Sequence, residues 1–102
     1  MSGAGGYADK PSPALILQDD AFDLTQSVTI CLLTTWDEEA PLARVLIQPS
    51  AENGLRAASY AMVDKIATVQ RTRLRVRVGR VETSNMVRVN GAVFAFLGLG
   101  TA

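Results

Sequence analysis

The sequence predicts a small domain that is mainly β with helices (α+β), built as a strongly curved, largely antiparallel sheet or small barrel with a C-terminal helix. Short apolar runs alternate with segments rich in turn-forming residues, a pattern typical of such sheets. Only the last segment carries apolar residues at the three-to-four spacing of a helix. A length of 102 residues fits one domain over residues 1–102.

The N-terminal part is expected to contribute one strand between two irregular segments. Residues 2–6 are glycine-rich and predict a loop or a loose terminus. Residues 14–18 are a continuous apolar run, typical of a strand that is buried on both faces. Residues 19–27 are polar and predict a turn that Phe22 anchors.

Two further strands are expected before the middle of the chain. Residues 28–33 predict a buried strand that contains Cys31, the chain's single cysteine. We interpret Cys31 as a small buried hydrophobic residue in a reducing compartment, because it has no partner for an internal disulfide. Residues 37–41 predict an acidic loop. Residues 42–48 alternate between apolar and polar, which predicts a half-exposed strand with Arg44 on its solvent face.

The next segments are a turn, a strand and a helical turn. Residues 49–54 predict a turn, because proline presets φ and Asn-Gly tolerates positive φ. Residues 59–69 predict one or two strands, broken near Asp64 and Lys65. Residues 71–74 predict a helical turn.

The chain is expected to close with a strand and a helix. Residues 75–81 alternate strictly between arginine and valine over most of their length, which predicts a strand with valines inward and arginines outward. Thr83 or Ser84 is the expected helix cap, and residues 98–100 favour a left-handed helix end. The expected buried stripe of the helix comprises Met86, Val89, Val93, Phe96 and Leu97.

The formal net charge of zero conceals two oppositely charged halves. Residues 1–54 hold two basic and eight acidic side chains, a net charge of −6, and residues 55–102 hold eight basic and two acidic ones, a net charge of +6. This asymmetry indicates one basic surface suited to a polyanion or to an acidic partner segment; a solvated basic face without a specific ligand is the alternative. No apolar run reaches the ~18 residues that span a bilayer, and the start lacks a signal-peptide pattern, so we expect a cytoplasmic protein with no membrane partner.

Seven short segments carry a pattern that becomes specific through their order and spacing. They are residues 13–22, 32–35 (Leu-Leu-Thr-Thr), 40–45, 48–55, 62–66 (Met-Val-Asp-Lys-Ile), 79–81 (Gly-Arg-Val) and 93–99. Together they resemble the MazF/PemK (Kid-like) toxin family of type II toxin–antitoxin systems. The resemblance implies a homodimer of small SH3-like barrels of the CcdB/PemK type. It also implies sequence-specific cleavage of single-stranded RNA without a metal or other cofactor, and a cognate antitoxin whose extended, acidic C-terminal segment blocks the groove.

The chain departs from the family pattern in two places. Ser12 occupies the position of the family's catalytic arginine, which binds and neutralises the phosphate. A serine hydroxyl brings a hydrogen-bond donor but no charge, so we expect attenuated cleavage, with Lys10 either a partial substitute or merely solvated. Family members also open with a strand of the type Arg-Gly-Asp/Glu-Ile-Trp, which we expect to be missing here; its absence would leave the next strand in need of a neighbour.

Metal-free RNA cleavage uses the 2′-hydroxyl of the substrate as the nucleophile, and it needs a base, a proton donor and a group that stabilises charge on the phosphate. The chain has no histidine, so this work falls to carboxylates, arginines, lysines or water. The resemblance implies that Thr34 donates to the phosphate and that Asp64 is the general base. The predicted catalytic set is Ser12, Thr34 and Asp64, and the predicted substrate-binding set is Lys10, Pro13, Arg44 and Lys65.

Each prediction has an alternative. Thr34 is otherwise an ordinary β-branched residue at a strand end, and Asp64 is otherwise half of a structural Asp–Arg pair. For the whole chain, the alternatives are a non-catalytic module of the same fold that binds an antitoxin or RNA, and, less favoured, a gyrase poison of the CcdB branch.

Overall fold

The computed structural model describes residues 2–7, 10–17, 20–36 and 43–99, with side chains described for residues 13–17, 21–36 and 43–99. The predicted acidic loop of residues 37–41 therefore lies outside the described residues. The elements in chain order are β1 (Ser2–Tyr7), β2 (Lys10–Ile16), the 3-10 turn η1 (Asp20–Phe22), β3 (Ser27–Thr34), β4 (Arg44–Ile47), β5 (Ser59–Gln70), the 3-10 turn η2 (Arg71–Arg73) and α1 (Thr83–Phe96).

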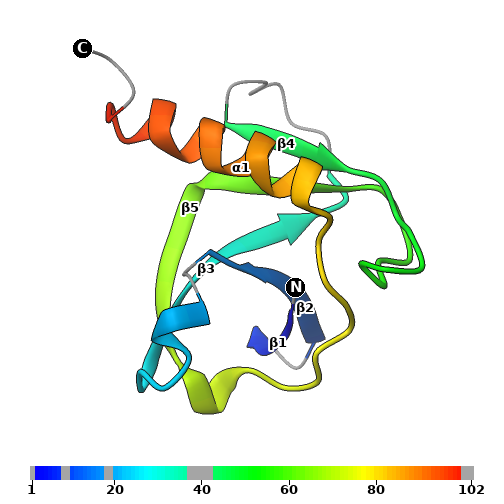
Figure 1. Ribbon diagram of the computed structural model, residues 1–102. Coiled ribbons are helices and arrows are strands. Elements are labelled where there is room, and N and C mark those ends of the chain that lie inside the picture. Colours follow the sequence, from blue (N-terminus) through cyan, green and yellow to red (C-terminus); the bar gives the residue numbers. More distant parts are fainter. Residues whose placement is uncertain (1, 8–9, 18–19, 37–42, 100–102) are drawn as a thin grey trace.

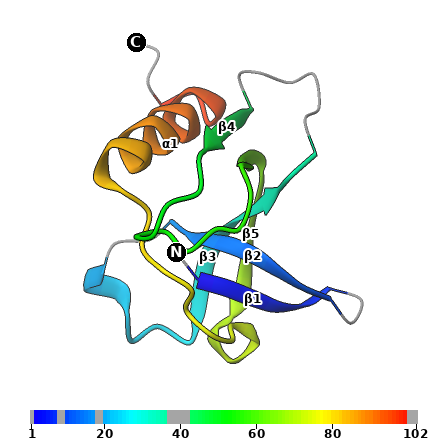
Figure 2. The same cartoon turned by 90° about the vertical axis from the view of Figure 1, so that its right-hand side faces the viewer.

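The strands of the described part form one antiparallel sheet in the order β1-β2-β3-β5-β4. The sheet is strongly curved, and α1 lies across its β4 and β5 end (Figures 1 and 2). The predicted mainly-β fold with a C-terminal helix is confirmed. None of the helices among the described residues is long and apolar enough to cross a membrane.

A register shift between β3 and β5 accounts for much of the curvature. Residues 66–70 of β5 pair with residues 27–31 of β3, but the register then shifts, and the next pair is Leu33 with Ala61. Residues left out of a ladder in this way bend a strand, and Figure 1 shows β5 turning a corner between its two ends. The break predicted near Asp64 and Lys65 is therefore an interruption of pairing inside one continuous strand.

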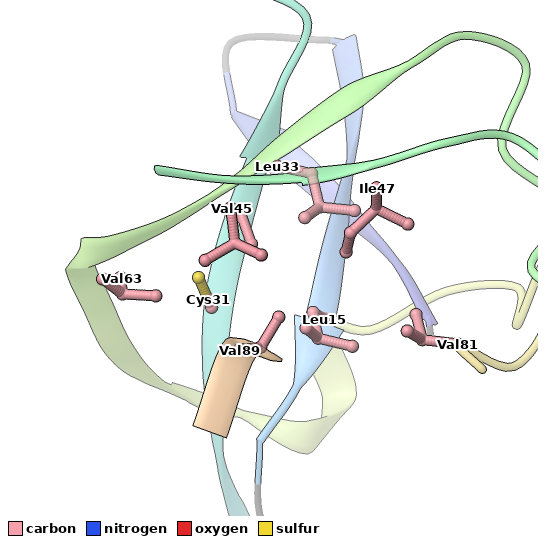
Figure 3. Close-up of a cluster of buried hydrophobic side chains, with 9 residues drawn as sticks. Leu15, Cys31, Leu33, Val45, Ile47, Val63, Val81 and Val89 are labelled. Atoms are coloured by element: carbon pink, nitrogen blue, oxygen red, sulfur yellow. The ribbon is translucent and has the colours of Figure 1, made fainter. Parts of the chain in front are cut away.

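The apolar side chains of β3 pack on both faces of the sheet, as predicted for residues 28–33. The main cluster lies between the sheet and α1 (Figure 3), and it comprises Leu15, Cys31, Leu33, Val45, Ile47, Ala61, Val63, Val81 and Val89. A second cluster on the other face comprises Ala14, Val28 and Ile30, with Leu74 of the segment after η2 packed against it. Full burial of a valine, leucine or isoleucine side chain is worth about 1.5–3 kcal/mol, so these clusters hold the sheet together.

The loop predicted for residues 2–6 is wrong, because these residues form most of β1. Ser2 lies opposite Ala14 and Ala4 lies opposite Ser12 of β2, with a register shift between Ala4 and Tyr7. Glycine weakens a strand only modestly, and backbone pairing with β2 outweighs that preference. The neighbour that β2 requires along this edge is β1 of the same chain.

The Phe22 residue is 57% exposed, so its side chain is not the buried anchor of the turn before β3, although its carbonyl oxygen accepts the Thr25 N–H at 3.2 Å. Arg71 holds this turn instead: its Nε donates to the carbonyl oxygen of Thr25 at 2.8 Å, and its backbone N–H donates to the carbonyl oxygen of Gln26 at 2.8 Å. The predicted helical turn at residues 71–74 is confirmed as η2, and Arg71 is part of the scaffold.

Residues 75–81 do not form the predicted strand. Val76 and Val78 are 74% and 46% exposed, and of the three valines only Val81 is buried. The segment is fixed by contacts with the turn at residues 49–54. A Cβ atom on Gly79 would lie 2.5 Å from the backbone of Asn53, so the two backbones cross here at a distance that leaves no room for a side chain.

Helix α1 agrees with the prediction at its centre and differs at both ends. Val89 is buried, and Met86 and Val93 pack against the main cluster. The expected Thr83 or Ser84 cap is wrong, since Glu82 is the N-cap residue and makes no side-chain cap bond. Phe96 and Leu97 are about half exposed, at 52% and 55%, because the last turn projects beyond the strands (Figure 1).

The predicted left-handed helix end is confirmed at Gly98, which has φ of +73°. The N–H of Gly98 donates to the carbonyl oxygen of Ala95 at 3.1 Å, and the N–H of Leu99 donates to that of Phe94 at 2.9 Å. These two bonds form the Schellman motif, which satisfies carbonyl groups that would otherwise have no partner.

Candidate active site

Arg44 and Asp64 form an ion pair between the adjacent strands β4 and β5. Arg44 lies opposite Met62, and Asp64 is two residues further along β5, so the two side chains are diagonal neighbours on one face of the sheet. The expectation of Arg44 on a solvent face is wrong, because the residue is only 8% exposed. Asp64 keeps 30% of its side-chain surface exposed and remains within reach of a ligand.

Strand alternation explains why Arg44 turns toward Asp64. Val45 and Ile47 of β4 point into the main cluster, so Arg44 and Leu46 must face the other way. A buried guanidinium needs a charged partner, and Asp64 supplies it. The Asp–Arg pair considered in the sequence analysis is therefore present, and the role of Asp64 as a base stays a prediction.

Thr34 ends β3 on this same face. It lies opposite Tyr60 of β5, which in turn lies opposite Leu46 of β4. The Thr34 Oγ1 accepts the backbone N–H of Trp36 at 3.1 Å. A hydroxyl that accepts one hydrogen bond can still donate its own proton, so Thr34 retains a donor for a phosphate oxygen.

Thr34, Tyr60, Met62, Arg44 and Asp64 thus share the face of the sheet that lies opposite the main cluster. We call this set the catalytic face, after the role predicted for Thr34 and Asp64. It brings together a hydroxyl donor, a phenol, a guanidinium and a carboxylate. The sequence analysis did not select Tyr60, although the alternation of residues 59–62 is a signal that could have placed it beside Thr34.

The remaining predicted site residues lie on β2 and beside Asp64. Ala14 of β2 lies opposite Leu32 of β3, and continuing this register by two residues brings the backbone of Ser12 level with Thr34. Pro13, between Ser12 and Ala14 in β2, is half-buried. The backbone of Lys10 pairs with that of Tyr7 on β1. Lys65 follows Asp64 and is exposed. The structure therefore joins Arg44 to Asp64, places Thr34 on their face, and leaves the substrate contacts of the other residues as predictions.

A polar network that the sequence analysis missed holds the turn at residues 49–54 against the start of α1. Asn53 is fully buried; its Oδ1 accepts the backbone N–H groups of Ser50 at 3.0 Å and Leu55 at 2.9 Å. Its Nδ2 donates to the carbonyl oxygen of Gln48 at 2.8 Å and to Glu82 Oε1 at 3.2 Å. The turn chemistry of Asn53 was visible in the sequence, but nothing local pointed to Glu82, 29 positions away.

Glu82 is the acceptor on which this network converges. The Ser50 hydroxyl donates to one carboxylate oxygen, and Asn53 and Asn85 donate to the other. The bond from Ser50 is the main reason that the pKa of the Glu82 carboxyl lies below its ordinary value of 4.5. A second hydrogen bond fixes α1 to the sheet: Arg88 of α1 donates to the carbonyl oxygen of Leu46 at 2.7 Å. Leu46 belongs to β4, the strand that carries Arg44 of the catalytic face.

We expect Cys31 to resist alkylation in the folded protein. Burial, and secondarily the Asp64 carboxylate, raise the pKa of its thiol from 9.0 to about 11, so little of the reactive thiolate forms at neutral pH. Mass spectrometry after iodoacetamide treatment should show modification only in denaturant. Rapid labelling of the native protein would contradict the burial of this side chain.

The same shift predicts how stability depends on pH. The unfolded thiol ionises first, near its ordinary pKa of 9.0, so the contribution of Cys31 to the free energy of unfolding is present below that pH and is lost as the pH rises toward about 11. Denaturant titrations at several pH values between 9 and 11 should therefore show that the free energy of unfolding falls more steeply with pH for the native chain than for Cys31→Ala.

Comparison with known proteins identifies similar sequences and folds. A family model described as "PemK-like, MazF-like toxin of type II toxin-antitoxin system" matches residues 2–97. The chain is 48% identical over 95 residues to "Probable endoribonuclease MazF" of Mycolicibacterium smegmatis, covering 93% of this chain and 87% of that protein.

Two solved structures share the fold over nearly their whole length. The structure described as "Endoribonuclease in complex with its cognate antitoxin from Mycobacterial species" aligns with a TM-score of 0.82 and 26% identity, covering 99% of this chain and 93% of that one. The Mycobacterium tuberculosis toxin MazF-mt6 aligns with a TM-score of 0.80 and 22% identity, covering 96% of this chain and 97% of that one.

Proposed function

Since this chain belongs to the PemK-like, MazF-like toxin family of type II toxin–antitoxin systems, we propose that it is the endoribonuclease toxin of such a pair and that it cleaves single-stranded RNA without a metal ion. The observation that carries the proposal is the family match over residues 2–97, which includes Thr34 and Asp64 on one face of the sheet.

The groups on the catalytic face suit cleavage by the RNA's own 2′-hydroxyl. Asp64, with 30% of its side chain exposed and one carboxylate oxygen engaged by Arg44, is the base that takes the 2′-hydroxyl proton. The Thr34 hydroxyl donates to a phosphate oxygen as negative charge builds there. Arg44 holds the carboxylate in place. Ser12, level with Thr34 across β2 and β3, supplies a neutral donor where family members carry an arginine, so cleavage is slow.

The partners that we propose are a second copy of the chain, single-stranded RNA and a cognate antitoxin with an acidic C-terminal segment. A related structure was solved as an endoribonuclease in complex with its cognate antitoxin, which supports the last of these. The basic C-terminal half of the chain complements both an acidic segment and RNA. The proposed location is the cytoplasm.

We expect the purified chain to cut a long single-stranded RNA at discrete sites in EDTA, and Asp64→Asn to abolish the cuts. Asparagine retains an oxygen that accepts the Arg44 hydrogen bond but cannot act as a base at neutral pH, so the scaffold is kept while the chemistry is removed. The new 5′ ends should be mapped by primer extension. Asp23→Asn, an exposed aspartate in the turn after η1, is the matched control and should cut like the native chain.

A non-catalytic binding module is the second candidate, and the Arg44–Asp64 pair favours it because one oxygen of the proposed base is already engaged. It predicts that RNA remains intact with the native chain, with Asp64→Asn and with Thr34→Val, while RNA or antitoxin binding persists. Discrete cuts in EDTA that disappear in Asp64→Asn would eliminate this alternative.

A further inference from the structure

The segment at residues 74–78, which we call the arginine strap, has the sequence pattern of a strand, but among its residues only Leu74 forms a β-bridge. Arg75 and Arg77 alternate with Val76 and Val78, and both valines are exposed, at 74% and 46%. Strict alternation is the pattern of a strand with one apolar face. Within the described part of the chain, no other segment covers that apolar face.

The backbone of the arginine strap is also available. Residues 76–78 lie outside every ladder of the sheet, and within the described ranges their N–H and C=O groups make no backbone hydrogen bond. The segment begins in extended conformation, with φ of −76° and ψ of 136° at Leu74. Exposed, extended backbone with unpaired donors and acceptors is the feature that an added strand pairs with.

Both ends of the arginine strap are fixed, which lowers the entropic cost of pairing. At one end Leu74 packs against the second cluster, and its N–H donates to the carbonyl oxygen of Arg71 at 3.0 Å. At the other end the N–H of Arg80 donates to the carbonyl oxygen of Glu52 at 2.9 Å. A segment already held between two anchors loses little conformational freedom when a partner binds.

The charges define the chemistry of the partner. Arg73, Arg75 and Arg77 are exposed, and none of them forms a salt bridge with an acidic group among the described residues. A second copy of the same segment would place arginine near arginine, which is unfavourable. Single-stranded RNA would satisfy the guanidinium groups but would neither pair with the carbonyl groups nor cover the valines. An extended peptide in which acidic and apolar residues alternate satisfies all three requirements.

We propose that the arginine strap is a strand-addition site for an extended peptide in which acidic and apolar residues alternate. The peptide pairs with the backbone of residues 76–78, lays its apolar side chains on Val76 and Val78, and places its carboxylates on Arg75 and Arg77. We take this peptide to be part of the antitoxin, and in this one respect the proposal rests on the proposed function. The antitoxin would then have a docking site that is separate from the catalytic face.

The test measures binding of a fluorescent eight-residue peptide of alternating Glu and Val to the full chain, by fluorescence anisotropy without RNA. Binding should be saturable and should weaken as salt rises. The Arg75→Glu/Arg77→Glu double variant should weaken it at least tenfold, and Val76→Ser/Val78→Ser should also weaken it. Arg56→Glu, an exposed arginine outside the strap, should change it less than threefold. A peptide of the same composition with its four Glu residues in one block should not bind.

N-methylation of the peptide separates strand pairing from simple charge attraction. A strand added to one neighbour uses the amides of only one of its edges. Methylating alternate amides on that edge should abolish binding, whereas methylating the other set should not. Equal tolerance of both methylated peptides, or equal binding of the blocked peptide, would overturn the proposal.

Two other results would also overturn it. One is loss of RNA binding in the Arg75→Glu/Arg77→Glu variant without any effect on the peptide, which would assign the strap to RNA. The other is conversion of that variant to a monomer in sedimentation, which would assign the strap to a second copy. Because peptide binding is measured without RNA, a failure here is distinguishable from a failure of cleavage.

Discussion

Ser12→Arg is expected to raise the rate of RNA cleavage by about 10²–10³-fold, since one preorganised donor at a developing negative charge is typically worth this factor. The register of β2 against β3 places the backbone of residue 12 level with Thr34, so we expect an arginine there to reach the phosphate group that the Thr34 hydroxyl is proposed to bind. An arginine adds a positive charge and a second donor that serine lacks. Initial rates on a short single-stranded RNA containing a mapped cleavage site, in EDTA, would measure the effect.

The control for this substitution is Ser84→Arg, which adds the same charge at an exposed position on α1. It should leave the rate within a few-fold of the native value, because charge far from the site acts only through screened attraction. An unchanged rate in Ser12→Arg, with clear cutting by the native chain, would mean that this chain stabilises the phosphate with another group. No cutting by either protein would support the non-catalytic module.

Asn53→Ala is expected to lower the free energy of unfolding by about 3 kcal/mol, because it removes a fully buried amide and leaves several partly buried backbone groups without partners at ~1–3 kcal/mol each. The affected groups are the N–H groups of Ser50 and Leu55 and the carbonyl of Gln48. For a domain of this size, such a loss lowers the melting temperature by roughly 10–20 °C. Denaturant titration with a thermal melt would measure both quantities.

Asn90→Ala is the matched control, since Asn90 is exposed on α1. It should change stability by less than ~0.5 kcal/mol. If Asn53→Ala were equally mild, the network between the 49–54 turn and the start of α1 would not be what orients that helix. RNA cleavage by Asn53→Ala, assayed well below its melting temperature, should persist, because no member of the network belongs to the catalytic face.

The sequence located the strands whose apolar residues are consecutive or alternate. Residues 28–33 predicted β3 because a buried strand needs apolar side chains at most of its positions, and the two clusters supply the two surfaces. The C-terminal helix was visible from Met86, Val89 and Val93, and its end from Gly98, because one residue with positive φ is a local requirement that glycine meets.

Other elements could not be predicted, because their cause lies elsewhere in the chain. The residues of β1 look like a loop, and only their pairing with β2 makes them a strand. Residues 75–81 look like a strand, but in the structure they are held against the turn at residues 49–54 by the close crossing at Gly79 and the bond from Arg80 to Glu52. In both cases local preferences are worth less than contacts with a distant segment.

By itself the sequence determined the fold class, the family resemblance and the residue types available for chemistry, because these depend on pattern and composition. The tertiary structure alone decided that Arg44 faces Asp64 across two strands rather than facing solvent, and that the valines of the arginine strap remain uncovered. The physical reason is strand register: a shift of one residue moves a side chain to the opposite face, and register is set by the packing of the whole sheet.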